Sequence, residues 1–88
     1  MSTGNNTSYN YTSTNASSQI KGSDGTLGGF FVTATTAGTI TIYDNTVSGG
    51  TVILATAILP VGFYPLPISF NNGCYITLSN MTVTMLWL

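Results

Sequence analysis

The stretch over residues 27–59 reads LGGFFVTATTAGTITIYDNTVSGGTVILATAIL and decides the fold class of this chain. It contains three apolar runs, which are separated at Ala37-Gly38 and again at residues 48–50, Ser-Gly-Gly. Between these breaks Ile40 and Ile42 alternate with more polar residues. This period of two places successive side chains on opposite faces of a β-strand. The stretch therefore predicts strands that are joined by glycine-containing turns.

The first two runs predict a β-hairpin with its turn at Ala37-Gly38. In residues 30–35, Phe30 and Val32 share the face that we expect to point inward, whereas Phe31 shares the other face with threonines. Residues 39–43 are expected to form the returning strand. An outward Phe31 would serve either a second core, in a two-layer sandwich, or a contact with another subunit.

The same pattern continues to the C-terminus. Residues 51–59 are apolar on both faces, which is typical of a strand that is covered on both sides. Residues 63–70 contain Pro65 and Pro67, which cannot donate hydrogen bonds to a neighbouring strand, so we expect this segment at a sheet edge or in a crossing between sheets. Its aromatic residues favour core packing over a ligand shelf. Residues 74–78 and 81–88 alternate again and predict the last two strands.

Strands thus recur at short intervals, and no helical periodicity is present. This pattern predicts an all-β domain over residues 19–88, a small antiparallel β-sandwich or jelly-roll-like domain of about six or seven strands. Residues 1–18 contain thirteen Ser, Thr or Asn and little apolar surface. We expect them to form an extended polar N-terminal arm, which is ordered only when it adds a strand to the sheet edge of a neighbour.

The composition excludes most kinds of catalytic, metal-binding and nucleic-acid-binding site. Charged residues make up 3% of the chain and are limited to Lys21, Asp24 and Asp44. Without His, Glu or Arg, the chain lacks a side chain that titrates near neutral pH, an imidazole metal ligand and a bidentate anion clamp. One cation cannot neutralise a phosphate backbone. We expect no enzymatic activity, no metal, no cofactor, no nucleic-acid partner and, because every apolar run is short, no membrane span.

Cys74 and Asp44 are each expected to have a structural role. Cys74 is the only cysteine, so no intrachain disulfide can form, and we expect it to be a buried small hydrophobic residue. Asp44 directly follows a strand, where its carboxylate is expected to accept hydrogen bonds from nearby backbone N–H groups.

The few charges also leave little electrostatic repulsion between copies, so we expect a homo-oligomer. The C-terminal pair of apolar residues should be buried against a neighbour or under a loop. Candidates for contacts between subunits are aromatic or apolar side chains on the arm, on the outer faces and at the C-terminus. They are Tyr9, Tyr11, Phe31, Ile53, Phe63, Tyr64, Trp87 and Leu88.

The turn and strand signals together resemble those of small virion proteins of tailed bacteriophages. The similar segments are Leu27-Gly28-Gly29 before an apolar strand, residues 37–45 (AGTITIYDN), Phe63-Tyr64-Pro65 and residues 72–76 (NGCYI). The resemblance covers about residues 20–86 and leaves the arm outside. It implies a structural protein of the virion, made in the host cytoplasm. The implied role is a capsid cement or decoration protein that sits on the head as a trimer and contacts the major capsid protein or another virion protein.

Two other roles remain open at this point. The first is a neck, tail or fibre component. The second is a glycan-binding adhesin module of the tail, in which Phe63, Tyr64 and Trp87 would serve as stacking platforms for sugars.

Overall fold

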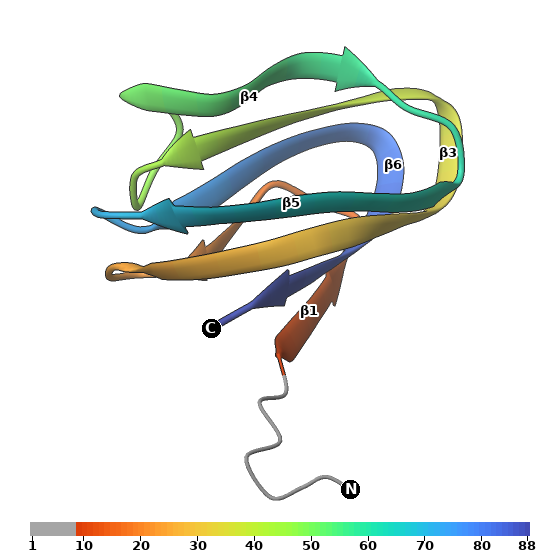
Figure 1. Ribbon diagram of the computed structural model, residues 1–88. Coiled ribbons are helices and arrows are strands. Elements are labelled where there is room, and N and C mark those ends of the chain that lie inside the picture. Colours follow the sequence, from red (N-terminus) through yellow and green to blue (C-terminus); the bar gives the residue numbers. More distant parts are fainter. Residues whose placement is uncertain (1–8) are drawn as a thin grey trace, which may run out of the picture.

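The computed structural model describes residues 9–88, which form six antiparallel strands in one sheet (Figure 1). The strands are β1 (Asn10–Thr14), β2 (Ser18–Lys21), β3 (Gly25–Asp44), β4 (Thr51–Ile58), β5 (Gly62–Phe70) and β6 (Cys74–Trp87). The all-β, antiparallel prediction is confirmed, and the number of strands agrees with it. The finer sandwich or jelly-roll arrangement stays a prediction, since all six strands belong to one hydrogen-bonded sheet.

Two long strands, β3 and β6, form the centre of the sheet and pair along almost their whole lengths. Each short strand then pairs with half of a long one. In the first half of the sheet, β5 pairs with residues 25–32 of β3 and β1 with residues 83–87 of β6. In the second half, β4 pairs with residues 39–44 of β3 and β2 with residues 74–76 of β6.

Both long strands bend at the same level of the sheet. The bend residues Ala37 and Asn80 have φ angles of 50° and 55°, in the left-handed region that non-glycine residues adopt uncommonly. The register between the two strands shifts between Thr35 and Thr39 at this level. The sheet therefore curls over, so that its two halves face each other (Figure 1).

The core fills the space between these two halves. Phe30 and Val32 of the first half are 2% and 1% exposed, and Ile40 and Ile42 of the second half are 0% exposed. The inward orientation that the alternation predicted for these four residues is confirmed. Other members of the core are Ile20, Leu27, Phe70, Cys74, Ile76, Met81, Val83 and Met85.

The predicted hairpin in residues 30–43 is wrong. Residues 25–44 form one continuous strand, and Ala37-Gly38 is its bend rather than a turn between two paired strands. The same applies to residues 74–88, where the expected break at Ser79-Asn80 is the matching bend of β6. The turn residues did mark a change of chain direction, but β3 and β6 pair with each other on both sides of the bend, so neither strand folds back on itself there.

The boundary expected between a separate arm and the domain also differs from the structure. Residues 10–14 are strand β1, which pairs with β6 of the same chain in unbroken register from Asn10 opposite Trp87 to Thr14 opposite Val83. This part of the predicted arm therefore belongs to the sheet. Residues 1–8 lie outside the described part of the chain.

Asp44 has the structural role expected of it. Its carboxylate accepts hydrogen bonds from the backbone N–H of Asn71, at 3.0 Å, and of Asn72, at 2.7 Å. These bonds tie the end of β3 to the turn between β5 and β6. The edge position expected for the proline-containing strand is confirmed as well, because β5 pairs with β3 alone among the described strands.

Candidate functional site: an outer aromatic face

The side chains on the outer face of the first half form the feature best suited to contact another molecule. Phe31 of β3 and Phe63 of β5 are paired across the two strands, and their ring centroids are 4.7 Å apart with an interplanar angle of 39°. They are 41% and 48% exposed. The outward orientation predicted for Phe31 is confirmed, and the structure adds Phe63 as its exposed partner.

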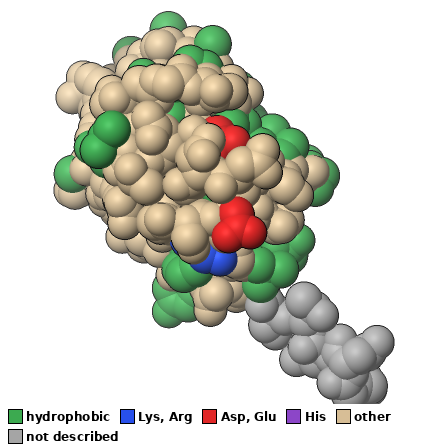
Figure 2. Space-filling model, turned by 90° about the vertical axis from the view of Figure 1, so that its left-hand side faces the viewer, with side chains coloured by type: hydrophobic (Ala, Val, Ile, Leu, Met, Phe, Trp, Pro, Cys, Tyr) green, Lys and Arg blue, Asp and Glu red, His purple; other side chains and the backbone are tan. Residues whose placement is uncertain are grey.

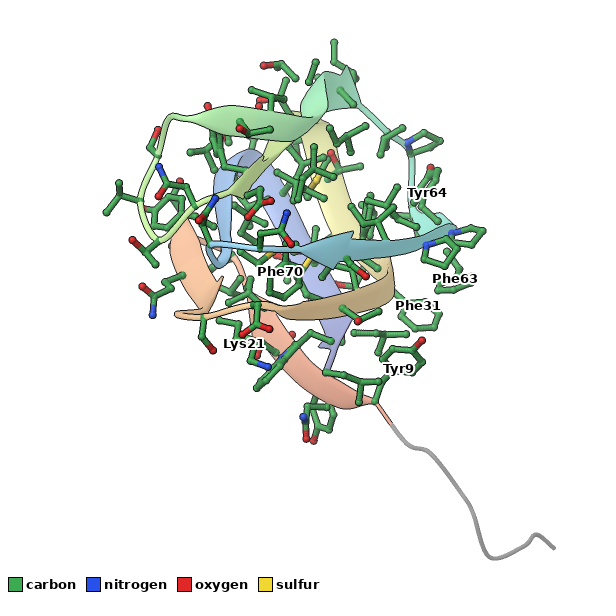
Figure 3. The ribbon with its side chains drawn as sticks, turned by 60° about the vertical axis from the view of Figure 1, so that its left-hand side comes forward. Tyr9, Lys21, Phe31, Phe63, Tyr64 and Phe70 are labelled. Atoms are coloured by element: carbon green, nitrogen blue, oxygen red, sulfur yellow. The ribbon has the colours of Figure 1, made fainter. Side chains whose placement is uncertain are left out.

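Two tyrosines lie on the same face. Leu86 of β6 pairs with Tyr11 of β1 and also with Gly29 of β3, so these three residues face the same side of the sheet. Phe31 lies two residues after Gly29 in β3 and therefore faces this side as well. The ring of Tyr9 lies over the strand at Gly28, 2.8 Å from the position that a Cβ atom on this glycine would occupy. Any larger residue at Gly28 would push the ring away. Figure 3 shows Tyr9, Phe31 and Phe63 along one side of the molecule.

We call Tyr9, Tyr11, Phe31 and Phe63 the outer aromatic face. The two tyrosines are 41% and 73% exposed. The only lysine and both aspartates belong to other parts of the described chain, and charged groups are visible at the end that carries the turns (Figure 2). The outer aromatic face therefore combines exposed rings with an uncharged surface, which suits a dry, hydrophobic contact.

The remaining candidates for intersubunit contacts do not join this face. Tyr64 points inward, where its ring stacks on Phe30 with centroids 5.4 Å apart and its hydroxyl donates to the Pro60 carbonyl at 2.6 Å. Ile53 is partly buried and packs against the core. Both side chains therefore contribute to this chain's own packing.

The C-terminal residues Trp87 and Leu88 are partly buried and make hydrogen bonds within their own chain. The Trp87 indole Nε1–H donates to Thr12 Oγ1 at 3.0 Å, and the Lys21 ammonium lies 6.0 Å from the ring centroid. The backbone N–H of Leu88 donates to the Thr26 carbonyl at 2.7 Å, while the Leu88 carbonyl accepts from the Thr26 N–H at 3.0 Å. Neither residue needs another subunit to satisfy its polar groups.

These positions also correct the set of residues suggested for sugar stacking. Phe63 points outward, Tyr64 points into the core and Trp87 is partly buried beside β1 and β2. The three rings do not form a common platform.

A second feature is a hollow of about 560 Å³ at the bend of the long strands. It is lined by hydroxyl, amide and apolar side chains and by no charged group; the lining residues are Asn15, Ala34, Thr35, Thr36, Asn80, Met81 and Thr82. Such a lining offers hydrogen bonds but no acid, base or nucleophile of unusual pKa. The hollow therefore gives less indication of a role than the outer aromatic face does.

Cys74 carries the only thiol of the chain, and its side chain is 0% exposed. Burial, with a smaller contribution from the negative charge of Asp44, raises the pKa of the Cys74 thiol from 9.0 to about 12. The protonated thiol is a poor nucleophile and a poor metal ligand. The burial expected for Cys74 is confirmed. Within residues 9–88, no three His, Cys, Asp or Glu side chains come together in a way that could hold a metal ion.

The raised pKa of Cys74 predicts a loss of stability at alkaline pH. Between pH 9 and about 12 the thiol ionises in the unfolded chain but stays protonated in the folded one. The free energy of unfolding contributed by this group should be constant below pH 9 and then fall by up to ~1.4 kcal/mol per pH unit across that window. Urea unfolding at pH 8 and pH 10.5 measures it. In Cys74→Ala the part of the decrease due to Cys74 should vanish.

No protein-family model, no curated protein and no solved structure matches this chain. Residues 9–88 also contain no helix whose length and hydropathy would suffice to cross a bilayer.

Proposed function

We propose that this chain is a structural subunit of a larger protein assembly, and that the assembly is the virion of a tailed bacteriophage. The observation that carries the structural role is the outer aromatic face, in which four exposed aromatic side chains gather on a surface without charge. An exposed apolar surface of this kind on a small protein marks a contact with another molecule. The sequence resemblance described above supports the proposal that this assembly is a phage virion.

Within the virion, the role that we propose is a capsid cement or decoration protein. The outer aromatic face would contact a second copy of this chain in a trimer, or the major capsid protein on the surface of the head. Its contacts would be hydrophobic and hydrogen-bonded, because the chain has only three charged residues. Attachment should then change little with ionic strength, since salt screens mainly contacts between charges.

The test of the assembly role is a substitution on the outer aromatic face. Phe31→Thr keeps a residue that favours strands but removes the exposed ring and its contact with Phe63. We expect it to weaken self-association or attachment to particles by about tenfold or more, because burial of a Phe side chain contributes about 1.5–3 kcal/mol. Sedimentation equilibrium and co-sedimentation with stripped particles measure the two contacts.

The matched control is Ile58→Thr on β4, where the side chain is 71% exposed but lies outside the outer aromatic face. It should leave association unchanged. If both variants weaken association equally, the contact is not specific to the outer aromatic face, and if neither does, the proposed assembly role fails.

The position in the particle needs a separate measurement. Quantitative mass spectrometry of purified particles gives the copy number of this chain relative to the major capsid protein. We expect comparable copy numbers for a decoration protein. A copy number far below that of the capsid protein would reject decoration and favour the neck, tail or fibre.

A further inference from the structure

The edges of the sheet differ in how they are protected against pairing with another strand. Each of the four short strands pairs with a single long strand among the described residues, so each leaves one edge free. Free edges are sites of pairing between chains unless prolines, charged side chains or bulges obstruct them. The four edges can therefore be compared for these features.

Three of the four edges carry such obstacles. Strand β5 contains Pro65 and Pro67, and its register against β3 shifts. The register of β4 against β3 shifts twice, between Ile40 and Ile42 and again between Ile42 and Tyr43. Strand β2 ends in the charged Lys21 and has a register shift before it.

Strand β1 carries none of these obstacles. Its sequence, Asn-Tyr-Thr-Ser-Thr, contains no proline and no charge. All five residues pair with β6 in one unbroken register, so the strand is regular along its length. Tyr11 and Ser13 on its outer side are both exposed. The β1 edge is therefore the one among residues 9–88 that is best prepared to accept another strand.

We propose that β1 of one copy pairs in antiparallel register with β1 of a second copy. A second copy always presents an equally unobstructed edge, and a twofold axis makes the same contact twice. Pairing over all five residues requires Thr12 to lie opposite Thr12 of the second copy. This register places the large Tyr11 opposite the small Ser13 and brings no charges together. It would also join the outer faces of the two first halves into one surface.

This pairing goes beyond the assembly role proposed above, because it uses backbone groups of β1 and does not require the contact through Phe31. A subunit with both contacts could be joined to neighbours in two directions, as a lattice requires. The two contacts can be separated by experiment, since each has its own variant.

Disulfide formation tests the register directly. Purified Tyr11→Cys and Ser13→Cys proteins are mixed in equal amounts and oxidised mildly. Directly opposite residues lie within disulfide range, whereas the 11–11 and 13–13 pairs are diagonal, about 7–8 Å apart. We expect the mixed 11–13 dimer to form about tenfold faster than either like pair. Wild-type protein controls for the native Cys74, which is fully buried.

Two results would overturn the proposal. If cross-linking of the mixture does not exceed that of wild type, the β1 edges do not meet. If the 11–11 or 13–13 dimer forms as fast as the mixed one, the strands do not pair about Thr12.

A charge on the edge gives an independent readout. Ser13→Lys should raise the dimer dissociation constant about tenfold, because two like charges then lie diagonally across the twofold axis and long side chains can approach each other at that spacing. Ser69→Lys adds the same charge to an exposed position on β5, at the opposite edge, and should leave the constant unchanged. Equal dissociation constants for both variants would contradict the pairing. Circular dichroism checks that each variant folds, and the disulfide experiment decides if Ser13→Lys does not.

Discussion

Replacement of Gly38 by alanine should destabilise the fold by about 3 kcal/mol or more, among the largest losses that a single methyl group can cause. A Cβ atom at Gly38 would overlap the carbonyl oxygen of Asn80 and would stand 2.5 Å from the carbonyl oxygen of Ser79. Both atoms belong to the backbone of β6 at its own bend. They cannot rotate away as a flexible side chain could.

Gly38 is required because the backbone of β6 approaches it closely, and not because of its own backbone conformation. Its neighbour Ala37 has the positive φ angle, whereas Gly38 is buried and donates its N–H to Thr35 Oγ1 at 2.9 Å. Ala37→Gly should accordingly have the opposite sign and stabilise the fold by up to about 1 kcal/mol, since glycine adopts a positive φ angle without steric cost.

Chemical denaturation of both variants measures these effects, with Gly22→Ala as the matched control. Gly22 is exposed in the turn before β3, and its nearest neighbour is the mobile end of the Gln19 side chain, 3.0 Å from the added Cβ atom. Gly22→Ala should change stability by less than about 0.5 kcal/mol. A loss for Gly38→Ala no larger than this would show that the two bends do not need their close contact.

The same bend explains what the sequence could and could not predict. Alternation identified the buried faces around Phe30 and Ile40 correctly, because side-chain period depends only on local strand geometry. It could not distinguish a turn at Ala37-Gly38 from a bend within one strand. That distinction depends on the partner strand β6, whose own bend at Asn80 lies more than forty residues away in the chain.

The candidate site was predictable in part, for a similar reason. The outward orientation of Phe31 follows from alternation, but its pairing with Phe63 depends on the register between β3 and β5, which a sequence does not reveal. The opposite positions of Phe63 and Tyr64 follow from their adjacency in one strand. The hydrogen bonds of Trp87 to Thr12 and of Leu88 to Thr26 were not predictable, because these partners lie far away in the sequence.

The N-terminal segment gives the sharpest contrast between composition and structure. Residues 1–18 are polar enough to predict an arm that leaves the fold intact when it is removed. In the structure, β1 instead completes the first half of the sheet and lies beside Val83 and Met85, which are both 0% exposed. Polar residues suffice for this position because an edge strand with one solvent-facing side contributes mainly backbone hydrogen bonds.

Deletion of residues 1–14 should therefore destabilise the fold by roughly 3 kcal/mol, which would lower the melting temperature by about 12–24 °C for a domain of this size. The deletion removes the backbone pairing of five residues with β6 and the hydrogen bond from Trp87 to Thr12. It also exposes one flank of the buried Val83 and Met85. The gain in chain entropy from not ordering β1 offsets part of this loss, which is why the expected effect is below the sum of the lost contacts.

The matched comparison is deletion of residues 1–8, which leaves β1 in place. The difference in stability between the two shortened proteins isolates the contribution of β1 from that of the segment before it. Thr12→Val, which keeps the shape of the side chain but cannot accept the hydrogen bond from Trp87, should reproduce about 1 kcal/mol of that difference. Equal melting temperatures for the two shortened proteins would mean that β1 contributes no stability to the sheet.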